Sequence, residues 1–268
     1  MKYTFLKNLW VEYGDTLGKT VFHPQYFTVK AASEGIELAK KYSRGTLLDI
    51  GCGRMPYRVE IEPLVDTYLG LDHPQVSKLY GGRWKPDILA DVIDIPLKGN
   101  TIDTVLLLQV LEHLDDPKKA LAEIFRILRP GGFVIGALPF LYPIHDSPYD
   151  MARYTEQMLR KLFISSGFQI VLIKAEGSFI GQIVQSINVF FMTRIKDILH
   201  AKMTIFSFFY LLFLVVISPI SIIVLNFFGA LLLFFGTFLP KYPNYFPIDY
   251  SFVLHKPVKG INARARKE

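Results

Sequence analysis

Cysteine is nearly absent from this sequence, which has one such residue, Cys52, among 268. A single cysteine excludes an intramolecular disulfide framework and a cysteine-rich zinc site, and it favours a reducing compartment. No internal repeat of 20–50 residues is visible, which argues against a solenoid. Hydrophobic residues make up 51% of the chain and charged residues 20%, so the sequence is too apolar to be disordered and can bury a large core.

Net positive charge is also small over most of the chain. The formal net charge is +6, and much of the excess lies near the carboxyl terminus, at Lys256, Lys259, Arg264, Arg266 and Lys267. A nucleic-acid-binding protein carries its basic residues in a stripe over the fold, so we expect no nucleic-acid partner. The basic tail over 257–268 is either solvated or, close to a membrane, attracted to anionic lipid.

Charge is missing altogether from one long stretch. The 38 residues between Lys202 and Lys241 contain no Asp, Glu, Lys, Arg or His. A transmembrane helix needs about 20 apolar residues, and Ser218-Pro219 interrupts this run near its middle. We therefore expect two helical arms, Met203–Ile217 and Ile220–Leu239, in a membrane hairpin that is re-entrant or spans twice. A buried helical subdomain or a dimer interface is the soluble alternative.

Short apolar runs alternate with helical patterns over the rest of the chain, which predicts a parallel sheet with helices on both faces. The expected helices cover Thr28–Tyr42, Pro117–Leu128 and Thr155–Ser165. The expected strands are Thr46–Ile50, Thr67–Leu71, Asp87–Ala90, Ile102–Leu108, Gly131–Leu138, Phe168–Lys174 and Tyr250–His255. The predicted fold class is α/β, a Rossmann-like doubly wound sheet of seven mostly parallel strands, with a hydrophobic helical hairpin inserted before the last strand.

Four segments follow from this pattern. We expect a helical lead-in over 1–45, a catalytic domain formed by 46–177 with 248–256, the hydrophobic insertion over 178–247 and the basic tail over 257–268. If the strands before and after the insertion are neighbours in one sheet, both ends of the insertion lie on one side of a membrane. The positive residues that flank the insertion then place both ends on the cytoplasmic side.

The first chemical motif is a strand that ends in a tight glycine turn, Asp49-Ile50-Gly51-Cys52-Gly53. Glycines without Cβ atoms let the backbone approach a ligand closely, and ligands bind at the carboxyl ends of strands in such sheets. A dinucleotide site has a third glycine where this chain has Pro56. Asp49 instead suits a ligand with a positively charged end, although a plain strand-to-helix turn also fits this motif.

Two further acids end the next two predicted strands. Asp72 follows Tyr68-Leu69-Gly70-Leu71, and a carboxylate at this place accepts hydrogen bonds from both hydroxyls of a ribose. Asp91, followed by Val92, ends the third strand and is placed to accept from an exocyclic amine. Taken alone, each acid is equally compatible with a helix cap or a turn.

After the fourth strand comes Gln109-Val110-Leu111-Glu112-His113-Leu114. A lone Glu-His pair is usually structural, and we expect no metal site.

Together these motifs resemble the class I S-adenosylmethionine-dependent methyltransferases, in the branch with a Leu-Asp-Ile-Gly-Cys-Gly turn and a Val-Leu-Glu-His-Leu segment. The resemblance covers about residues 45–175 and the last strand. It implies that S-adenosyl-L-methionine is the cofactor and that four groups of residues bind it. The methionine end would meet Asp49, Gly51 and Gly53, the ribose Asp72, the adenine Asp91 and the Val92 amide, and the sulfonium Gln109. Many relatives have a glycine where this chain has Met55, whose side chain would narrow the turn.

A polar loop after the fifth strand contains His145-Asp146-Ser147-Pro148-Tyr149-Asp150 and Arg153-Tyr154-Thr155. It resembles the His-x-x-Pro-Tyr-Asp-x-x-Arg-Tyr-Thr segment of methyltransferases that accompany surface-polysaccharide and glycolipid synthesis. A hydroxyl acceptor benefits from a base that takes its proton as the new bond forms, and His145 is the candidate, with Asp146 and Asp150 in reserve. Tyr149, Arg153 and Tyr154 are candidate acceptor-binding residues. Alternatively, these residues only shape the loop.

The sequence therefore predicts a membrane-attached methyltransferase whose acceptor is a hydroxyl of a lipid-linked sugar. One alternative is a methyltransferase of an isoprenoid quinone or another membrane lipid. The other is a non-catalytic protein of the same fold that anchors a membrane assembly. The oligomeric state cannot be inferred from the sequence.

Overall fold

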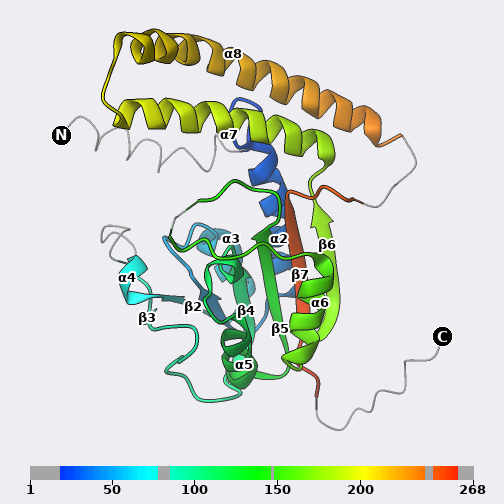
Figure 1. Cartoon of the computed structure of the whole chain (residues 1–268). Helices are drawn as coiled ribbons and strands as arrows, with labels where there is room; N and C mark the ends of the chain where they lie inside the picture. The colour runs from blue at the N-terminus through cyan, green and yellow to red at the C-terminus, as the bar shows by residue number, and fades with distance from the viewer. Residues whose placement is uncertain (1–18, 78–84, 146–147, 239–243, 259–268) are drawn as a thin grey trace. The chain divides into compact units, whose positions relative to one another are not determined.

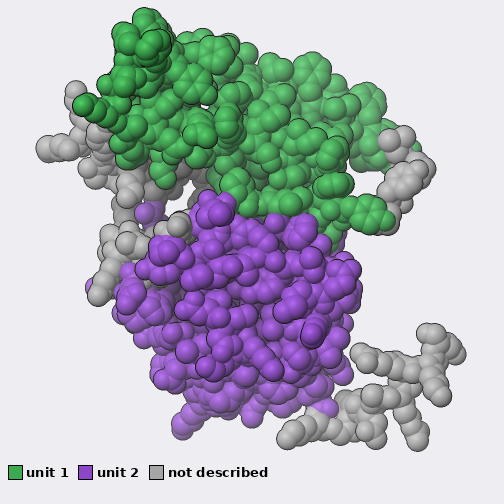
Figure 2. All heavy atoms as spheres, viewed as in Figure 1, with its two compact units in different colours: residues 1–31, 141–143, 175–249 green, residues 32–140, 144–174, 250–268 purple. Residues whose placement is uncertain are grey.

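The computed structural model describes residues 19–77, 85–145, 148–238 and 244–258 (Figure 1). The chain divides into two compact units, which are coloured separately in Figure 2. Unit 1 comprises Met1–Ala31, Leu141–Pro143 and Ala175–Asp249. Unit 2 comprises Ala32–Phe140, Ile144–Lys174 and Tyr250–Glu268. The predicted catalytic domain and insertion meet near the division at residues 174 and 175, whereas the predicted lead-in over 1–45 is divided between the units.

One sheet holds the seven strands in the order β3-β2-β1-β4-β5-β7-β6 (Figure 1). The strands are β1 Thr46–Ile50, β2 Thr67–Asp72, β3 Ile88–Leu89, β4 Ile102–Leu108, β5 Leu128–Pro139, β6 Gln169–Glu176 and β7 Asp249–His255. The pairs β3–β2, β2–β1, β1–β4 and β4–β5 are parallel. The predicted fold class is confirmed.

Strand β7 runs in the opposite direction to its neighbour β5. The Gly131 N–H donates to the Lys256 carbonyl near the start of β5, and the Leu141 N–H donates to the Ile248 carbonyl after its end. Strand β4 lies in the core because its second half is a continuous apolar run, and Val105, Leu106 and Leu107 are fully buried. The parallel strands all end at one carboxyl edge, where the candidate residues gather.

The helices and turns are α2 Tyr26–Tyr42, α3 Arg58–Ile61, η1 Glu62–Leu64, α4 Pro74–Ser77, η3 Leu111–His113, α5 Pro117–Ile127, α6 Glu156–Ser165, α7 Phe179–His200 and α8 Ile205–Gly236. Helix α5 begins as predicted, because the Asp116 side chain accepts the Lys119 N–H and Pro117 occupies the first turn. Helix α6 begins at the predicted Thr155 cap.

Lys256 is not solvated, although the sequence places it beside the predicted basic tail. Its ammonium group is buried and donates to the carbonyls of Phe125 and Leu128 at the end of α5 and to Asn100. Three donors on one ammonium group satisfy carbonyls that the helix end leaves without intrahelical partners. Lys256 therefore stabilises the fold of unit 2 and does not contribute to a lipid-binding tail.

Unit 1 contains a helical hairpin made of α7 and α8, as Figure 1 shows. The prediction of two arms separated at Ser218-Pro219 is wrong, because α8 continues through Pro219 for 32 residues. The turn of the hairpin lies at residues 201–204, and α7 is its first arm. Pro219 removes one backbone hydrogen bond from α8 but does not end the helix, because apolar residues continue on either side of it.

The two helices of the hairpin meet through their small and polar residues. The buried residues of α8 form one stripe: Leu214, Ser218, Ile222, Asn226 and Gly229. Asn188 of α7 donates to Asn226, which in turn donates to the carbonyls of Val21 and His23. Apolar side chains cover the remainder of α8, and Phe206, Phe209 and Phe234 are at least 60% exposed. This helix hides its polar groups and exposes its apolar ones.

Candidate functional site

The glycine turn after β1 has the backbone conformation that only glycine adopts without strain. Gly51 and Gly53 have φ angles of +68° and +51°. A Cβ atom on Gly51 would lie 2.5 Å from the Cγ2 atom of Val110, which follows β4. The turn therefore packs directly against the segment after β4, and a larger residue at position 51 would separate the two.

Asp49 lies in β1 just before this turn and is almost fully buried. The Tyr68 hydroxyl on the neighbouring strand donates to its carboxylate at 2.5 Å. Burial raises the pKa of Asp49 to about 7, with a further contribution from the Asp72 charge, and the Tyr68 hydrogen bond opposes this shift. Asp49 is therefore an acid that a cationic ligand would ionise fully. Tyr68 was quoted in the sequence motif but was not among the predicted site residues.

Asp72 ends β2, as predicted, and holds the glycine turn in place. Its carboxylate accepts the N–H of Gly53 at 3.0 Å and that of His73 at 2.7 Å. Burial raises the pKa of Asp72, and these two hydrogen bonds work in the opposite direction. The carboxylates of Asp49 and Asp72 are close enough for the Asp72 charge to raise the pKa of Asp49, so the structure brings these two predicted residues together.

Asp91 follows β3 at the same edge of the sheet. The Ala90 N–H donates to the Asp72 carbonyl at 3.1 Å, which ties the end of β3 to the end of β2. The Asp91 side chain is exposed and accepts the Ile93 N–H at 3.2 Å, while Val92 is buried. The three acids thus lie at or close to the ends of three adjacent strands. The Asp91 carboxylate is hydrogen-bonded within its own turn.

Two residues near the turn adopt the left-handed conformation although they have side chains. Gln109 has a φ angle of +55° and donates its N–H to the Ala137 carbonyl of β5 at 2.7 Å. Such strain costs about 1–2 kcal/mol and is concentrated at functional sites. Met55 has a φ angle of +54°, and its side chain is buried in the core beside Gly70. Since Met55 points into the core, it fills the space beside β2.

The loop after β5 is organised by Asp150. The Arg153 guanidinium binds both carboxylate oxygens of Asp150, at 2.5 and 2.7 Å, and holds the pKa of Asp150 well below its ordinary value. Asp150 also accepts the His145 backbone N–H at 3.0 Å, and its Oδ2 atom lies 3.2 Å from the Nδ1 atom of His145. Asp150 therefore acts on His145 as an ionised orienting group, in the way that a carboxylate orients a histidine in a catalytic triad.

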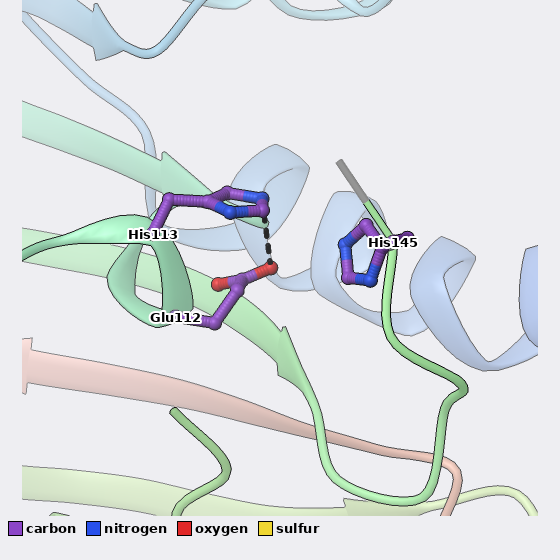
Figure 3. A group of neighbouring side chains, drawn as sticks. All are labelled: Glu112, His113 and His145. Carbon is purple, nitrogen blue, oxygen red and sulfur yellow. Dashed lines mark ion pairs between the residues drawn. The ribbon is translucent and has the colours of Figure 1, made fainter. Parts of the chain in front are cut away.

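His145 faces the Glu-His pair that follows β4 (Figure 3). The rings of His113 and His145 have centroids 5.3 Å apart, and the Nε2 atom of His113 lies 3.8 Å from the Oε1 atom of Glu112. The two segments are also joined through the backbone, because the Met151 and Ala152 N–H groups both donate to the Glu112 carbonyl. Sequence reasoning quoted Glu112 and His113 but could not connect them with a histidine more than thirty residues away.

The remaining predicted residues occupy different environments. Tyr149 is exposed, and its carbonyl lies 3.0 Å from the Nδ1 atom of His113. Tyr154 is buried, and burial together with the Glu112 charge raises the pKa of its hydroxyl. Asp146 lies outside the described residues. The roles assigned to these residues and to the cofactor-binding acids stay predictions.

The comparisons with known proteins match this arrangement. Residues 48–136 match a family model described as a methyltransferase domain. A probable S-adenosylmethionine-dependent methyltransferase of Mycolicibacterium smegmatis is 26% identical over 147 residues, 50% of this chain and 55% of that protein. The demethylmenaquinone methyltransferase of Renibacterium salmoninarum is 33% identical over 122 residues, 43% of this chain and 49% of that protein. This chain thus spans about half the length of these relatives.

Among solved structures, the [4+2]-cyclase SpnF has a TM-score of 0.52 and 17% identity, and the match covers 85% of this chain and 82% of that one. That likeness supports the fold alone. Residues 48–136 are therefore similar to methyltransferase domains, and these similarities agree with the predicted enzyme class and with S-adenosyl-L-methionine as the cofactor.

Proposed function

We propose that this protein transfers the methyl group of S-adenosyl-L-methionine to a hydroxyl of a membrane-borne acceptor, a lipid-linked sugar. The observation that carries the proposal is the carboxyl edge of the sheet, where Asp49, Asp72 and Asp91 end adjacent strands beside the strained residue Gln109. The resemblance to methyltransferases of surface-polysaccharide and glycolipid synthesis, carried by the His145–Thr155 segment, suggests the acceptor class.

Each predicted cofactor contact has a chemical reason. Asp49 supplies a carboxylate for the ammonium group of the methionine end, and the Gly51–Gly53 turn lets the backbone approach that end closely. Asp72 accepts from the ribose hydroxyls, while Asp91 and the Val92 amide meet the adenine. Gln109 lies between the glycine turn and β5, which is the place for the sulfonium.

Methyl transfer needs alignment of the nucleophile with the methyl carbon, and a hydroxyl nucleophile must also lose its proton. His145 is proposed as the base, because a neutral imidazole that donates through Nδ1 to Asp150 keeps a lone pair on Nε2. Arg153, Tyr149 and Tyr154 are proposed to shape the acceptor side. The methyl carbon leaves the sulfur as its bond to oxygen forms, which releases S-adenosylhomocysteine and one proton.

The membrane part of the proposal rests on helix α8. Within the described residues, α8 is the one helix long and apolar enough to cross a membrane, and only 17% of its most apolar stretch is buried. A helix of a water-soluble core buries its apolar face, whereas α8 exposes that face and buries Ser218 and Asn226. Small and polar residues at the contact between helices are typical of packing within lipid.

The charges of unit 1 favour attachment to one leaflet without crossing. Arg194, Lys196 and Lys202 lie at the turn of the hairpin, not at its base, where Lys241 follows α8 in the sequence. A hairpin that crossed the membrane would separate these two positive regions. Keeping both on the cytoplasmic side, as the positive-inside rule favours, requires the hairpin to lie along the surface of one leaflet with the apolar face of α8 inserted.

The acceptor is tested by measuring methyl transfer to a sugar in its free form and in its lipid-linked form, with the protein in vesicles. We expect the lipid-linked form to react faster, because the membrane concentrates acceptor and enzyme together. Equal rates would remove the lipid requirement. Calorimetric titration with S-adenosyl-L-methionine tests the underlying assignment, because the non-catalytic alternative predicts no binding.

The second candidate, methylation of a quinone or another membrane lipid, is favoured by the similarity to the demethylmenaquinone methyltransferase. Deleting the gene separates the two. A change in the methylated lipid extract with unchanged glycans supports the quinone reading, and the opposite result supports the sugar.

A further inference from the structure

Three side chains with metal-binding atoms converge at the carboxyl edge of unit 2. Glu112 and His113 belong to η3, after β4, and His145 belongs to the loop after β5. One ligand atom from each lies within 4.8 Å of the other two. Figure 3 shows the two imidazole rings and the carboxylate facing a shared space from two different segments.

The surroundings of His113 fix which ring nitrogen it offers. The Nδ1 atom lies 3.0 Å from the Tyr149 carbonyl oxygen. A carbonyl oxygen only accepts, so Nδ1 carries the proton and the lone pair resides on Nε2. That Nε2 atom lies on the side of Glu112, 3.8 Å from its Oε1 atom.

His145 is oriented in the same way by a carboxylate. Its Nδ1 atom lies 3.2 Å from the Oδ2 atom of Asp150, which Arg153 binds through both oxygens. The Arg153 Nη2 atom also lies near Nδ1, at 3.5 Å, and the shorter distance to Asp150 favours a proton on Nδ1, which leaves Nε2 with a lone pair. Metal-binding histidines commonly donate their other N–H to a carboxylate or a backbone carbonyl, and here one histidine uses each kind of partner.

We propose that Glu112, His113 and His145 bind a divalent transition-metal cation. Two imidazole nitrogens and one carboxylate suit zinc, manganese, iron or cobalt, and three protein ligands leave positions open for an oxygen of the substrate. The Glu112 side chain is fully buried, which matches the burial of carboxylates that are paired or coordinated. Bonds of about 2.0–2.2 Å require the three ligand atoms to close by roughly 1 Å, which side-chain rotation supplies.

The role inferred here for the cation, activation of the acceptor hydroxyl, rests on the proposed function. Bound to the open position, the acceptor hydroxyl would lose its proton more easily, as water does on a metal. The hydroxyl proton goes to solvent, the oxygen bonds to the methyl carbon and the carbon–sulfur bond breaks, so charge and atoms balance. In the loaded protein the Nε2 lone pair of His145 binds the cation, so the cation takes the place of His145 in promoting loss of the hydroxyl proton.

Binding of Co²⁺ alone to the full chain in detergent, after treatment with a chelator, tests the site without any turnover. We expect one Co²⁺ per chain by calorimetry, with visible absorption bands that indicate nitrogen and oxygen ligands. The variants Glu112→Gln, His113→Ala and His145→Ala should each lower the affinity for Co²⁺ by at least tenfold, since loss of even a supporting residue costs about 10–100-fold.

The matched control is His200→Ala, which removes an exposed histidine of α7 and should leave Co²⁺ binding unchanged. Every variant is also titrated with S-adenosyl-L-methionine, and retained binding demonstrates that the variant is folded. The proposal is overturned if the wild-type chain binds no stoichiometric Co²⁺, or if the three variants bind it as tightly as the wild type. Loss of cofactor binding in the wild type would instead refute the proposed function and leave the Co²⁺ result to stand alone.

Discussion

Strand β4 and helix α8 have nearly the same kind of composition and opposite surroundings. Both contain long apolar runs, yet Val105, Leu106 and Leu107 of β4 are fully buried, while Phe206 and Phe209 of α8 are largely exposed. The polar residues explain the difference. Unit 2 gathers buried acids at the end of its strands, where a ligand can meet them, and unit 1 buries amides between two helices. An apolar run therefore identifies a core or a lipid-facing surface only when its polar neighbours are located.

The largest expected effect comes from adding charge to the exposed face of α8. The double variant Phe213→Arg with Ile220→Arg should lower the fraction of protein that floats with anionic vesicles, because each arginine in hydrocarbon costs about 2.5–3.5 kcal/mol. Both side chains are more than half exposed, so the fold of unit 1 should survive.

The matched control replaces exposed apolar residues of unit 2 instead, as Ile164→Arg with Val171→Arg. Flotation should not change in this control. The contrary outcome has two parts: the α8 variant still floats, and the wild type is a dimer in solution whereas the variant is a monomer. In that case the apolar face of α8 is a protein interface and the contrast with β4 disappears.

The next largest effect concerns Asp72, whose carboxylate is proposed to accept from two ribose hydroxyls. Asp72→Ala should weaken S-adenosyl-L-methionine binding by about a hundredfold or more, since hydrogen bonds to charged groups contribute about 1.5–3 kcal/mol each. Calorimetry measures the affinity. Asp66→Ala, which removes an exposed acid just before β2, is the control and should bind normally. Unchanged affinity in Asp72→Ala would contradict the assignment of this edge of the sheet to cofactor binding.

A smaller effect follows from the pKa of Asp49, which burial raises to about 7. The affinity for S-adenosyl-L-methionine should rise about tenfold between pH 6 and pH 8 as Asp49 ionises, and then level off. The folded state holds a proton that the unfolded state has released between about pH 4 and pH 7, so the contribution of Asp49 to stability falls as pH rises through this range.

The variant Asp49→Asn separates these two consequences. It should abolish the pH dependence of cofactor affinity, and it should raise the melting temperature at pH 8 more than at pH 5, because the neutral amide avoids a buried charge. A wild-type affinity that is flat from pH 6 to pH 8 would contradict the assignment of Asp49 to the cationic end of the cofactor.

The smallest effect concerns Gln109 and its left-handed backbone. Gln109→Gly should be more stable than Gln109→Ala by about 1 kcal/mol, because only glycine relieves the strain, and both should lose activity to a similar extent. Denaturant unfolding and turnover measure the two quantities. Equal stabilities would show that the conformation is not strained.

The sequence was sufficient for the sheet, because β1, β2 and β5 are largely apolar and end at a glycine turn, an acid and a proline. It was not sufficient for the hairpin. Proline and serine at 218–219 read as a break, but a helix whose other residues are strongly apolar continues through them. The amide contact between Asn188 and Asn226 joins residues that no local pattern relates.

The positions of Asp49 and Asp72 were predictable, because each lies near the end of a single strand. The site was not predictable where two loops must meet. Glu112 and His113 read as a structural pair, and only the packing of the loop after β5 brings His145 to them. The Asp150–Arg153 pair shows that the alternative of a loop-shaping ion pair was also correct in part, since Asp150 is held by Arg153 while it orients His145.

Strand β7 lies between β5 and β6 although it is the last to be synthesised. On the ribosome, α8 therefore emerges while the sheet still has an open gap between two of its strands. The apolar helix is therefore complete before the sheet, which closes only when β7 and Lys256, whose ammonium group binds the end of α5, have left the exit tunnel. Synthesis of the apolar helix and completion of the sheet are thus ordered in time by the position of a single strand.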